Sequence, residues 1–190
     1  MPRECKGDLD GTHNATNVPP RPLLYVSEMT IRIALYAPDI PQNTGTVLRL
    51  CACLGIEAHI IEPAGFPTSD RAFHRAGMDY LEAVTLVRHA SWGEFETWRR
   101  RARHRLVLFT TKAAMSYLDY GFVAEDVLLF GRESAGVPAE VHAAADARLL
   151  IPMRPELRSL NVAVTAAMAA GEALRQTKTG TQTGFPLARE

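Results

Sequence analysis

The sequence is poor in the residues that build disulfides, metal sites and membrane spans. Its three cysteines are an odd number, and Cys51 and Cys53 are two positions apart, so on a helix they point to different faces. We expect small buried thiols in a reducing cytoplasm. The six histidines form no H-E-x-x-H or comparable pair, so we expect no metal. No apolar run approaches the ~18–20 residues of a membrane-spanning helix, so we expect no membrane association.

An excess of charge of one sign is also absent. The chain has 21 basic and 21 acidic residues, so it lacks the net positive charge typical of proteins that bind nucleic acid through bulk electrostatics. Lysine is scarce: three of the basic residues are Lys and the other 18 are Arg, the better fork for phosphate. An apolar fraction of 47% and a charged fraction of 22% exclude wholesale disorder. The length of 190 residues predicts one folded domain.

Composition divides the chain into three segments. Residues 1–28 contain Gly, Asn, Thr and Pro without sustained periodicity, so we expect a disordered or loosely docked N-terminal arm. Residues 29–176 are expected to form the domain, and Met29 is an alternative candidate for the true start of the protein. Residues 177–190 are polar and rich in turn formers, as in a C-terminal tail.

Within the domain, short apolar runs alternate with amphipathic segments. Strands are expected at residues 31–37, 57–61, 83–87, 106–110, 127–130 and 148–151. Helices are expected at residues 44–54, 70–77, 91–103, 138–145 and 162–175. The first helix is expected to bury Val47, Leu50, Cys51 and Leu54. This alternation predicts an α/β fold with a mostly parallel sheet and helices on both faces.

Small and polar residues follow several expected strands, at the edge where parallel sheets bind ligands. No G-x-G-x-x-G occurs, and Val137-Pro138 follows the glycine loop at 131–136 where a phosphate loop requires Lys and then Ser or Thr. The ordinary nucleotide-binding folds are therefore disfavoured. Each post-strand loop taken singly is explained more readily by chain turning, as at Gly131, or by helix capping, as at Ser159.

Taken in order, three strings resemble the motifs of the SPOUT methyltransferases. They are PQNTGTVLRLCACLG at 41–55, LLFGRESAGVP at 128–138 and LLIPMRPELRSLNVAVTAAMAA at 149–170. A narrower resemblance, to the small subgroup that methylates the wobble nucleotide of tRNA, rests on HIIEPAGFP at 59–67, RAGMDYLEAV at 75–84 and FTTKA at 109–113. The resemblance extends from about residue 31 to residue 175, and the N-terminal arm has no counterpart in it.

This resemblance implies a Rossmann-like sheet with a C-terminal deep trefoil knot, in a homodimer with the site near the interface. It implies S-adenosylmethionine as the methyl donor. The acceptor would be the ribose 2′-hydroxyl of the wobble nucleotide, cytidine or uridine, in the tRNA anticodon, and leucine tRNAs are the expected substrates. Two alternatives stay open: a SPOUT enzyme acting on another RNA, such as ribosomal RNA, and a non-catalytic RNA-binding dimer.

The resemblance also assigns roles to individual residues. Binding of S-adenosylmethionine, largely through backbone groups, falls to Phe109, Gly131, Ile151, Met153, Ser159 and Asn161. Catalysis falls to Arg49 and Asn43. Because arginine stays protonated, we expect Arg49 to hold the adjoining phosphate and to orient the ribose. Which group acts as the base that deprotonates the 2′-hydroxyl stays open. Contacts with tRNA phosphates are expected from Lys112, Arg132, Arg154 and Arg158. Glu133 is expected either to shape the pocket or to have a purely structural role. The basic run at 99–105 is more readily explained as a solvated helix surface than as a secondary contact with tRNA.

Overall fold

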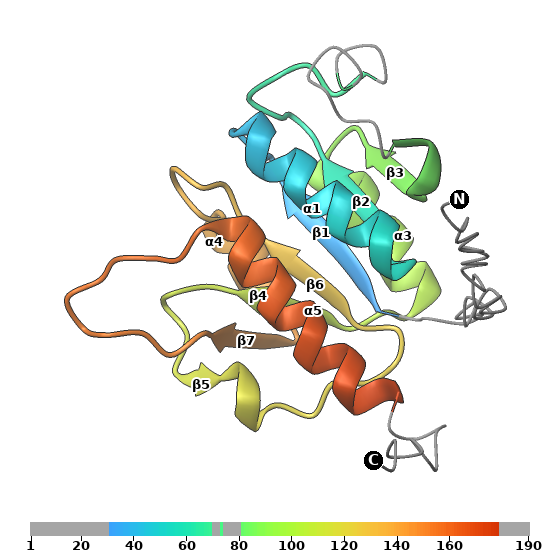
Figure 1. The fold of residues 1–190 in the computed structure, drawn as a ribbon. Helices are drawn as coiled ribbons and strands as arrows, with labels where there is room; N and C mark the ends of the chain where they lie inside the picture. The colour runs from blue at the N-terminus through green and yellow to red at the C-terminus, as the bar shows by residue number, and fades with distance from the viewer. Residues whose placement is uncertain (1–30, 70–72, 74–80, 179–190) are drawn as a thin grey trace, which may run out of the picture.

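The computed structural model describes residues 31–69, 73 and 81–178 (Figure 1). The arm at 1–28, the tail beyond residue 178 and, apart from Phe73, the helix expected at 70–77 lie outside the described residues. In chain order the elements are β1 (Arg32–Tyr36), α1 (Pro41–Leu54), β2 (Glu57–Ile61), η1 (Leu81–Ala83), β3 (Leu86–His89), α3 (Trp92–Ala102), β4 (Leu106–Phe109), β5 (Met115–Ser116), η2 (Tyr117–Asp119), β6 (Val127–Phe130), α4 (Ala139–Ala144), β7 (Ala147–Leu150) and α5 (Val162–Lys178), where η marks a 3₁₀ helix.

The strands form one seven-stranded sheet in the order β3-β2-β1-β6-β4-β7-β5. All pairings between these described strands are parallel. In the middle of the sheet, Ile33 of β1 pairs with Ala58 of β2 on one side and with Leu128 of β6 on the other. Parallel strands require crossover connections, and these contain α1 between β1 and β2, α3 between β3 and β4, and α4 between β6 and β7. The predicted α/β class with a parallel sheet is confirmed.

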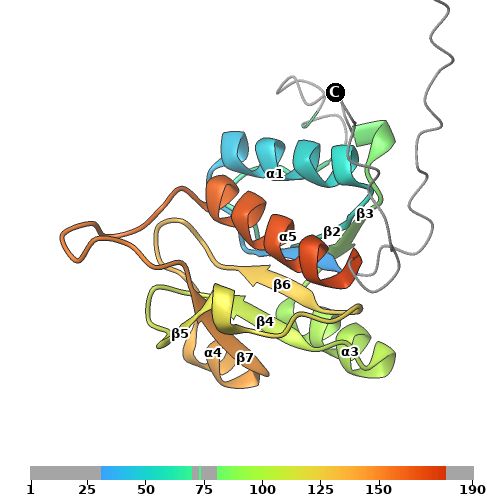
Figure 2. The same ribbon diagram turned by 60° about the horizontal axis from the view of Figure 1, so that its bottom comes forward.

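Helices cover both faces of the sheet (Figure 2). α1 and α5 lie side by side on one face, and α3 and α4 lie on the other. Successive residues of a strand pack into different hydrophobic cores on the two faces of the sheet. Ile33 and Leu35 pack into the core under α1 and α5, whereas Ala34 packs with Phe95 of α3 into the core on the other face. Because both faces are buried, strands such as β6 are apolar throughout. None of the described helices is long and apolar enough to cross a membrane.

Helix α1 differs from its prediction in two ways. It begins at Pro41, three residues before the expected start, because proline in the first helical turn needs no N–H donor and already has a helical φ. Val47 and Cys51 are buried as predicted, but the other fully buried residues are Thr44 and Leu48. The predicted Leu50 and Leu54 are only half-buried, packed against the edge of the core.

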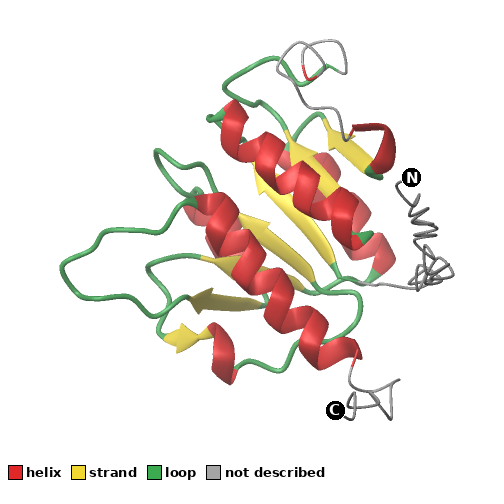
Figure 3. Cartoon of the chain, viewed as in Figure 1, coloured by secondary structure: helices red, strands yellow, loops and turns green. Residues whose placement is uncertain are grey.

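Other differences concern the ends of elements. β3 runs over Leu86–His89 and not over 83–87, because the η1 helix extends to Ala83. Ser91 caps α3 as predicted, accepting a hydrogen bond from the N–H of Glu94, and α5 continues three residues past the expected end, to Lys178. The two-residue strand β5 was not predicted. The loops after β4, β6 and β7 extend from one edge of the sheet (Figure 3).

Candidate active site

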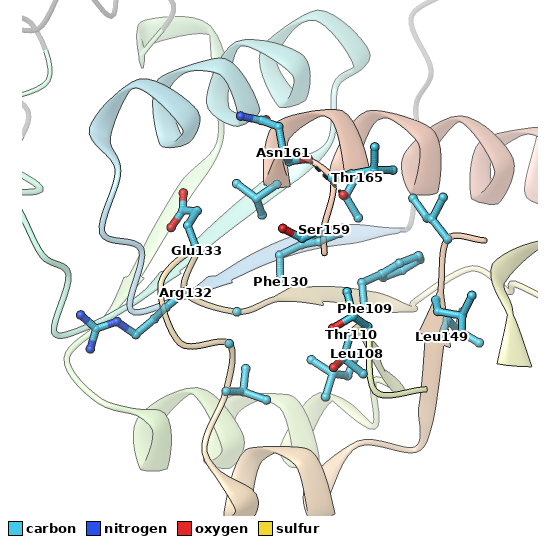
Figure 4. A pocket seen from close by; sticks show the side chains of 18 of the residues that line it. Leu108, Phe109, Thr110, Phe130, Arg132, Glu133, Leu149, Ser159, Asn161 and Thr165 are labelled. Carbon is cyan, nitrogen blue, oxygen red and sulfur yellow. Dashed lines mark hydrogen bonds between the residues drawn. The ribbon is translucent and has the colours of Figure 1, made fainter. Parts of the chain in front are cut away.

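A cavity of ≈ 390 Å³ lies at the carboxyl ends of β4, β6 and β7 (Figure 4). Its apolar wall comes from the last residues of these strands, among them Phe109, Phe130 and Leu149. Its polar wall comes from the loops that follow the strands and from the first turns of α1 and α5. Because the carboxyl edge of a parallel sheet is where ligands bind, this cavity is the candidate active site.

Eight of the twelve predicted site residues line this cavity. They include one of the two catalytic candidates, Asn43, and one of the four phosphate-binding candidates, Arg132. They also include every predicted cofactor-binding residue: Phe109, Gly131, Ile151, Met153, Ser159 and Asn161. Segments separated by more than a hundred residues of sequence therefore meet at one place.

Four predicted residues do not line the cavity. Arg49 is exposed on α1, six residues after Asn43, which is about 9 Å further along the helix axis. Lys112 is exposed directly after Thr110 and Thr111, which do line the cavity. Arg154 and Arg158 are exposed in the loop between β7 and α5. Of the five cations predicted to act at the site, Arg132 therefore lines the cavity of this single chain and the other four do not.

The loop from Gly131 to Gly136 closes on itself beside the cavity. The N–H of Arg132 donates to the carbonyl of Gly136 at 3.0 Å, and the N–H of Gly136 donates back to the carbonyl of Arg132 at 2.8 Å. A Cβ atom on Gly131 would lie 2.6 Å from the carbonyl carbon of Gly136. Only glycine allows the two ends of the loop to approach so closely.

A chain of side-chain amides connects three elements around the cavity. Asn161 Oδ1 accepts hydrogen bonds from the N–H groups of Ala163 (2.8 Å) and Val164 (3.3 Å), which fixes the orientation of its amide at the start of α5. Asn161 Nδ2 must then donate, and it does so to Asn43 Oδ1 at 2.9 Å. Asn43 Nδ2 in turn donates to Glu133 Oε1 at 3.2 Å. Backbone donors of α5 therefore determine which way the Asn43 amide faces.

Two carboxyl groups, those of Glu133 and Asp39, lie at the end of this series of hydrogen bonds. Burial, followed by the hydrogen bond with the Asp39 side chain, raises the pKa of Glu133 above its ordinary value. The hydrogen bond with Glu133, followed by that from the Ser134 hydroxyl, holds the pKa of Asp39 well below its ordinary value. In this pair Asp39 therefore carries the charge and Glu133 retains the proton to higher pH.

Several functional positions were missed by the sequence reasoning. Leu108, Phe130 and Leu149 form the apolar wall, and only their place at the carboxyl ends of strands could have indicated it. Thr165 lines the cavity from the first turn of α5, where its hydroxyl donates to the carbonyl of Asn161 at 3.0 Å. Asp39 was not singled out in the sequence, although it follows β1 at the ligand-binding edge.

The basic run at 99–105 lies at the opposite, amino end of the strands, between α3 and β4. Arg99 is buried, contrary to the expected solvated surface, because its guanidinium donates to Glu96 at 2.7 Å and to Asp146 at 3.1 Å. Arg105 donates to Asp126 at 2.7 Å. Carboxylates thus neutralise part of the run. Among the described residues, no group of three or more His, Cys, Asp or Glu is placed to hold a metal ion.

The parallel sheet and the cavity walled by three post-strand loops define an α/β protein with a ligand-sized cavity at the carboxyl edge of its sheet. The chain belongs to the SpoU rRNA Methylase family, whose model matches residues 30–171. It is 66% identical over 144 residues to a tRNA (cytidine(34)-2'-O)-methyltransferase of Beijerinckia indica subsp. indica, covering 76% of this chain and 90% of the relative. A protein of the same name from Ancylobacter novellus is 57% identical over 156 residues, covering 82% and 99%.

Solved structures agree with this assignment. A structure from work on the 2-OH methylation of C/U34 on tRNA aligns with a TM-score of 0.72 and 43% identity, covering 79% of this chain and 97% of that one. An AdoMet-bound rRNA methyltransferase from Sinorhizobium meliloti aligns with a TM-score of 0.70 and 28% identity, covering 78% of this chain and 57% of that one.

Proposed function

We propose that this protein methylates the ribose 2′-hydroxyl of the nucleotide at position 34 of tRNA, cytidine or uridine, with S-adenosylmethionine as methyl donor. The observation that carries the proposal is the similarity to relatives named for this reaction, at up to 66% identity over 90% of the relative's length. The cavity supports it, because it is lined by all the residues that the motifs assign to the cofactor. The resemblance further favours leucine tRNAs as substrates. A tRNA substrate would place the protein in the cytoplasm.

The cavity has features that fit S-adenosylmethionine. Its volume of ≈ 390 Å³ falls within the range of roughly 300–1,000 Å³ typical of small-ligand sites. Phe109, Phe130 and Leu149 offer an apolar wall for a purine ring, and Gly131, which has no side chain, leaves its backbone groups open to a ligand in the cavity. When bound, S-adenosylmethionine would supply an electrophilic methyl group on a sulfonium centre.

The chain's own residues would position the acceptor. Methyl transfer requires in-line attack, so much of the acceleration is expected to come from orientation of the ribose. The Asn43 amide is fixed by Asn161 and Glu133 at the cavity wall, where it can hydrogen-bond a ribose hydroxyl. Arg49 would hold the neighbouring phosphate with its planar guanidinium. Lys112, Arg154 and Arg158, exposed near the same edge, would contact further phosphates.

The assembly would be a homodimer with a knotted C-terminal region, as the resemblance implies. Apolar side chains exposed in the β7–α5 loop and on α5 offer a face for a second copy: Leu157, Leu160, Val164 and Met168 are 61%, 38%, 48% and 38% exposed. α1 lies beside α5 (Figure 2), so Arg49 would be carried close to such an interface. Multi-angle light scattering of the wild type and of Val164→Glu tests this part: a wild-type monomer would contradict it.

A ribosomal RNA substrate is the second candidate, because the family carries rRNA in its description. Sequence identity favours tRNA, at 43% to the structure from the work on C/U34 of tRNA and 28% to the Sinorhizobium meliloti rRNA enzyme. This chain spans 97% of the structure from the work on C/U34 of tRNA but 57% of the Sinorhizobium meliloti rRNA enzyme. The larger enzyme therefore contains a substantial additional region that this chain does not match.

Mass spectrometry of nucleosides tests the function directly. Wobble nucleosides of tRNA from cells with and without the gene would be compared, and the purified protein would be added back with S-adenosylmethionine. We expect 2′-O-methylation at position 34 to disappear without the gene and to return in vitro. Unchanged methylation at that position, with a loss in ribosomal RNA, would instead establish the second candidate.

A further inference from the structure

Asp39 holds three successive residues of the Gly131–Gly136 loop. Its Oδ1 accepts from the N–H of Glu133 at 3.2 Å, and its Oδ2 accepts from the Ser134 hydroxyl. The Nε of Arg132 lies 3.7 Å from the same Oδ2. The Asp39 side chain is 15% exposed and is not part of the cavity lining, so it acts from behind the loop.

The backbone of Asp39 is itself held in place from the other side. The N–H of Gly65, in the loop after β2, donates to the carbonyl of Pro38 at 2.8 Å. A Cβ on Gly65 would lie 3.0 Å from both Cα and Cβ of Asp39, so the two segments are packed as closely as glycine permits. Asp39 therefore has little room to move away from the loop that it holds.

Asp39 and Glu133 bind each other reciprocally. The N–H of Glu133 donates to the Asp39 carboxylate, and the N–H of Asp39 donates to Glu133 Oε2 at 3.3 Å. The second oxygen of Glu133 is then turned toward Asn43 Nδ2, 3.2 Å away. The position of the Asn43 amide thus depends on α5 through Asn161 and on Asp39 through Glu133.

We propose that Asp39 is a positioning residue for methyl transfer: its carboxylate holds the Gly131–Gly136 loop so that Glu133 fixes the Asn43 amide at the cavity wall. This inference rests on the proposed function for its catalytic consequence, although the contacts that it names do not. Asp39 does not line the cavity, so it would act entirely through Glu133 and the loop.

The charge of Asp39 gives this role a measurable signature. An ionised Glu133 accepts the Asn43 hydrogen bond more strongly than a neutral one, so turnover should fall as the pH drops through the pKa of Glu133. Burial and Asp39 both raise that pKa. Replacing Asp39 by the uncharged Asn removes one of the two causes, so the acidic limb of the pH profile should move to lower pH.

The test compares wild type with Asp39→Asn, Asp39→Glu and, as a matched control, Asp119→Asn at an exposed position of η2. Turnover, the KM values for tRNA and S-adenosylmethionine, and melting temperature are measured between about pH 5 and 9. In Asp39→Asn we expect kcat to fall about tenfold or more, KM values to stay within about threefold, and the acidic limb to move down by ~0.5–1 pH unit. Asp39→Glu keeps the negative charge, so the acidic limb of its pH profile should stay at the wild-type pH, and its turnover should exceed that of Asp39→Asn. The control should match wild type.

Two outcomes would overturn the inference. One is Asp39→Asn turnover within about twofold of wild type. The other is a loss of turnover that parallels a loss of melting temperature, with the acidic limb unmoved, which would make Asp39 merely structural.

A carbon-13 NMR titration of the Glu133 carboxyl, without RNA, separates this inference from the proposed function. A lower pKa for Glu133 in Asp39→Asn than in wild type supports the inference even if no tRNA is methylated. An identical titration in the two proteins contradicts it, whatever the substrate.

Discussion

Two groups of titratable side chains with shifted pKa values lie in different places: Glu133 lines the cavity, whereas His59, His89 and His104 lie on the α3 face of the sheet. At the cavity edge, burial is the first cause that raises the pKa of Glu133. On the α3 face of the sheet, burial lowers the pKa of His59 to about 3 and also lowers the pKa values of His89 and His104. In both regions burial penalises the charged form of the group.

The histidine cluster, formed by His59, His89 and His104, is packed against aromatic side chains of α3. His59 Nδ1 lies 2.9 Å from His89 Nε2, so one neutral ring donates to the other. The His59 ring centroid is 4.2 Å from that of Trp98, and the His89 centroid is 5.2 Å from that of Phe95. His59 is completely buried, at 0% exposed. A shifted pKa therefore indicates a functional site only where a ligand can reach the group; Glu133 meets this condition and His59 does not.

The largest effect is expected at Arg49, and it tests how far the functional region extends beyond the cavity. If its guanidinium orients phosphate and ribose, Arg49→Ala should reduce turnover by about 100-fold or more while S-adenosylmethionine still binds. Arg49→Lys should rescue poorly, because an ammonium group cannot reproduce the planar fork. As Arg49 is exposed on α1, stability should change by at most ~0.5 kcal/mol.

Methyl transfer to tRNA lacking the wobble modification, calorimetry with S-adenosylmethionine and thermal melting check this prediction together. Arg101→Ala, at an exposed position of α3, is the matched control. Near-normal turnover in Arg49→Ala would remove Arg49 from the catalytic residues and confine the functional region to the cavity.

Gly131→Ala should damage the cavity wall directly. The new Cβ would lie 2.6 Å from the carbonyl carbon and 2.9 Å from the carbonyl oxygen of Gly136, which are backbone atoms that cannot turn aside. We expect a destabilisation of ~1–3 kcal/mol and at least a tenfold loss of affinity for S-adenosylmethionine, measured by denaturation and calorimetry. Gly121→Ala, where a Cβ meets nothing within 4 Å, is the control. Unchanged affinity would show that the loop can open without cost.

The histidine cluster should govern stability, with a defined dependence on pH. The folded pKa of His59 is about 3, below an unfolded value of about 6.5, so the unfolded chain binds more protons in acid. Its stabilising contribution is therefore complete above about pH 6.5 and is lost as the pH falls toward 3, at up to ~1.4 kcal/mol per pH unit. Urea denaturation across this range should show a shallower slope in His59→Phe. Parallel slopes in the two proteins would show that the cluster does not control acid stability.

The sequence predicted features that depend on neighbours along the chain. β2 and β6 were predicted with their observed ends: β6 is a short apolar run that stops before Gly131, and β2 lies between Gly55 and Pro63. Contacts between segments distant in the sequence could not be predicted. Asp39 meets Glu133 across 94 residues of sequence, and no local pattern around Asp39 indicated this contact. Arg99 is buried because Asp146, 47 residues away, reaches it.

The histidine cluster could not be predicted from the sequence for the same reason. His59 and His89 meet because β2 and β3 pair in a register that places His59 beside Val87 and Ile61 beside His89. Such a register is set by the whole sheet, so neither residue carried a local signal. The post-strand loops at the cavity were predictable, by contrast, because their motifs lie in continuous strings of sequence.

The smallest effect expected distinguishes the arginines of the two regions. Arg132 lies at the cavity wall with its side chain 41% exposed, whereas Arg101 lies on α3 at the opposite end of the strands. If tRNA lies over the cavity, Arg132→Ala should weaken its binding about three- to tenfold and reduce the slope of log affinity against log salt concentration by about one. Arg101→Ala should leave both quantities unchanged. Filter binding over a range of salt concentrations measures them. Equal losses of affinity in both variants would mean that the RNA also contacts the α3 end of the molecule. The RNA surface would then include both regions, whereas the cofactor cavity would still belong to one of them.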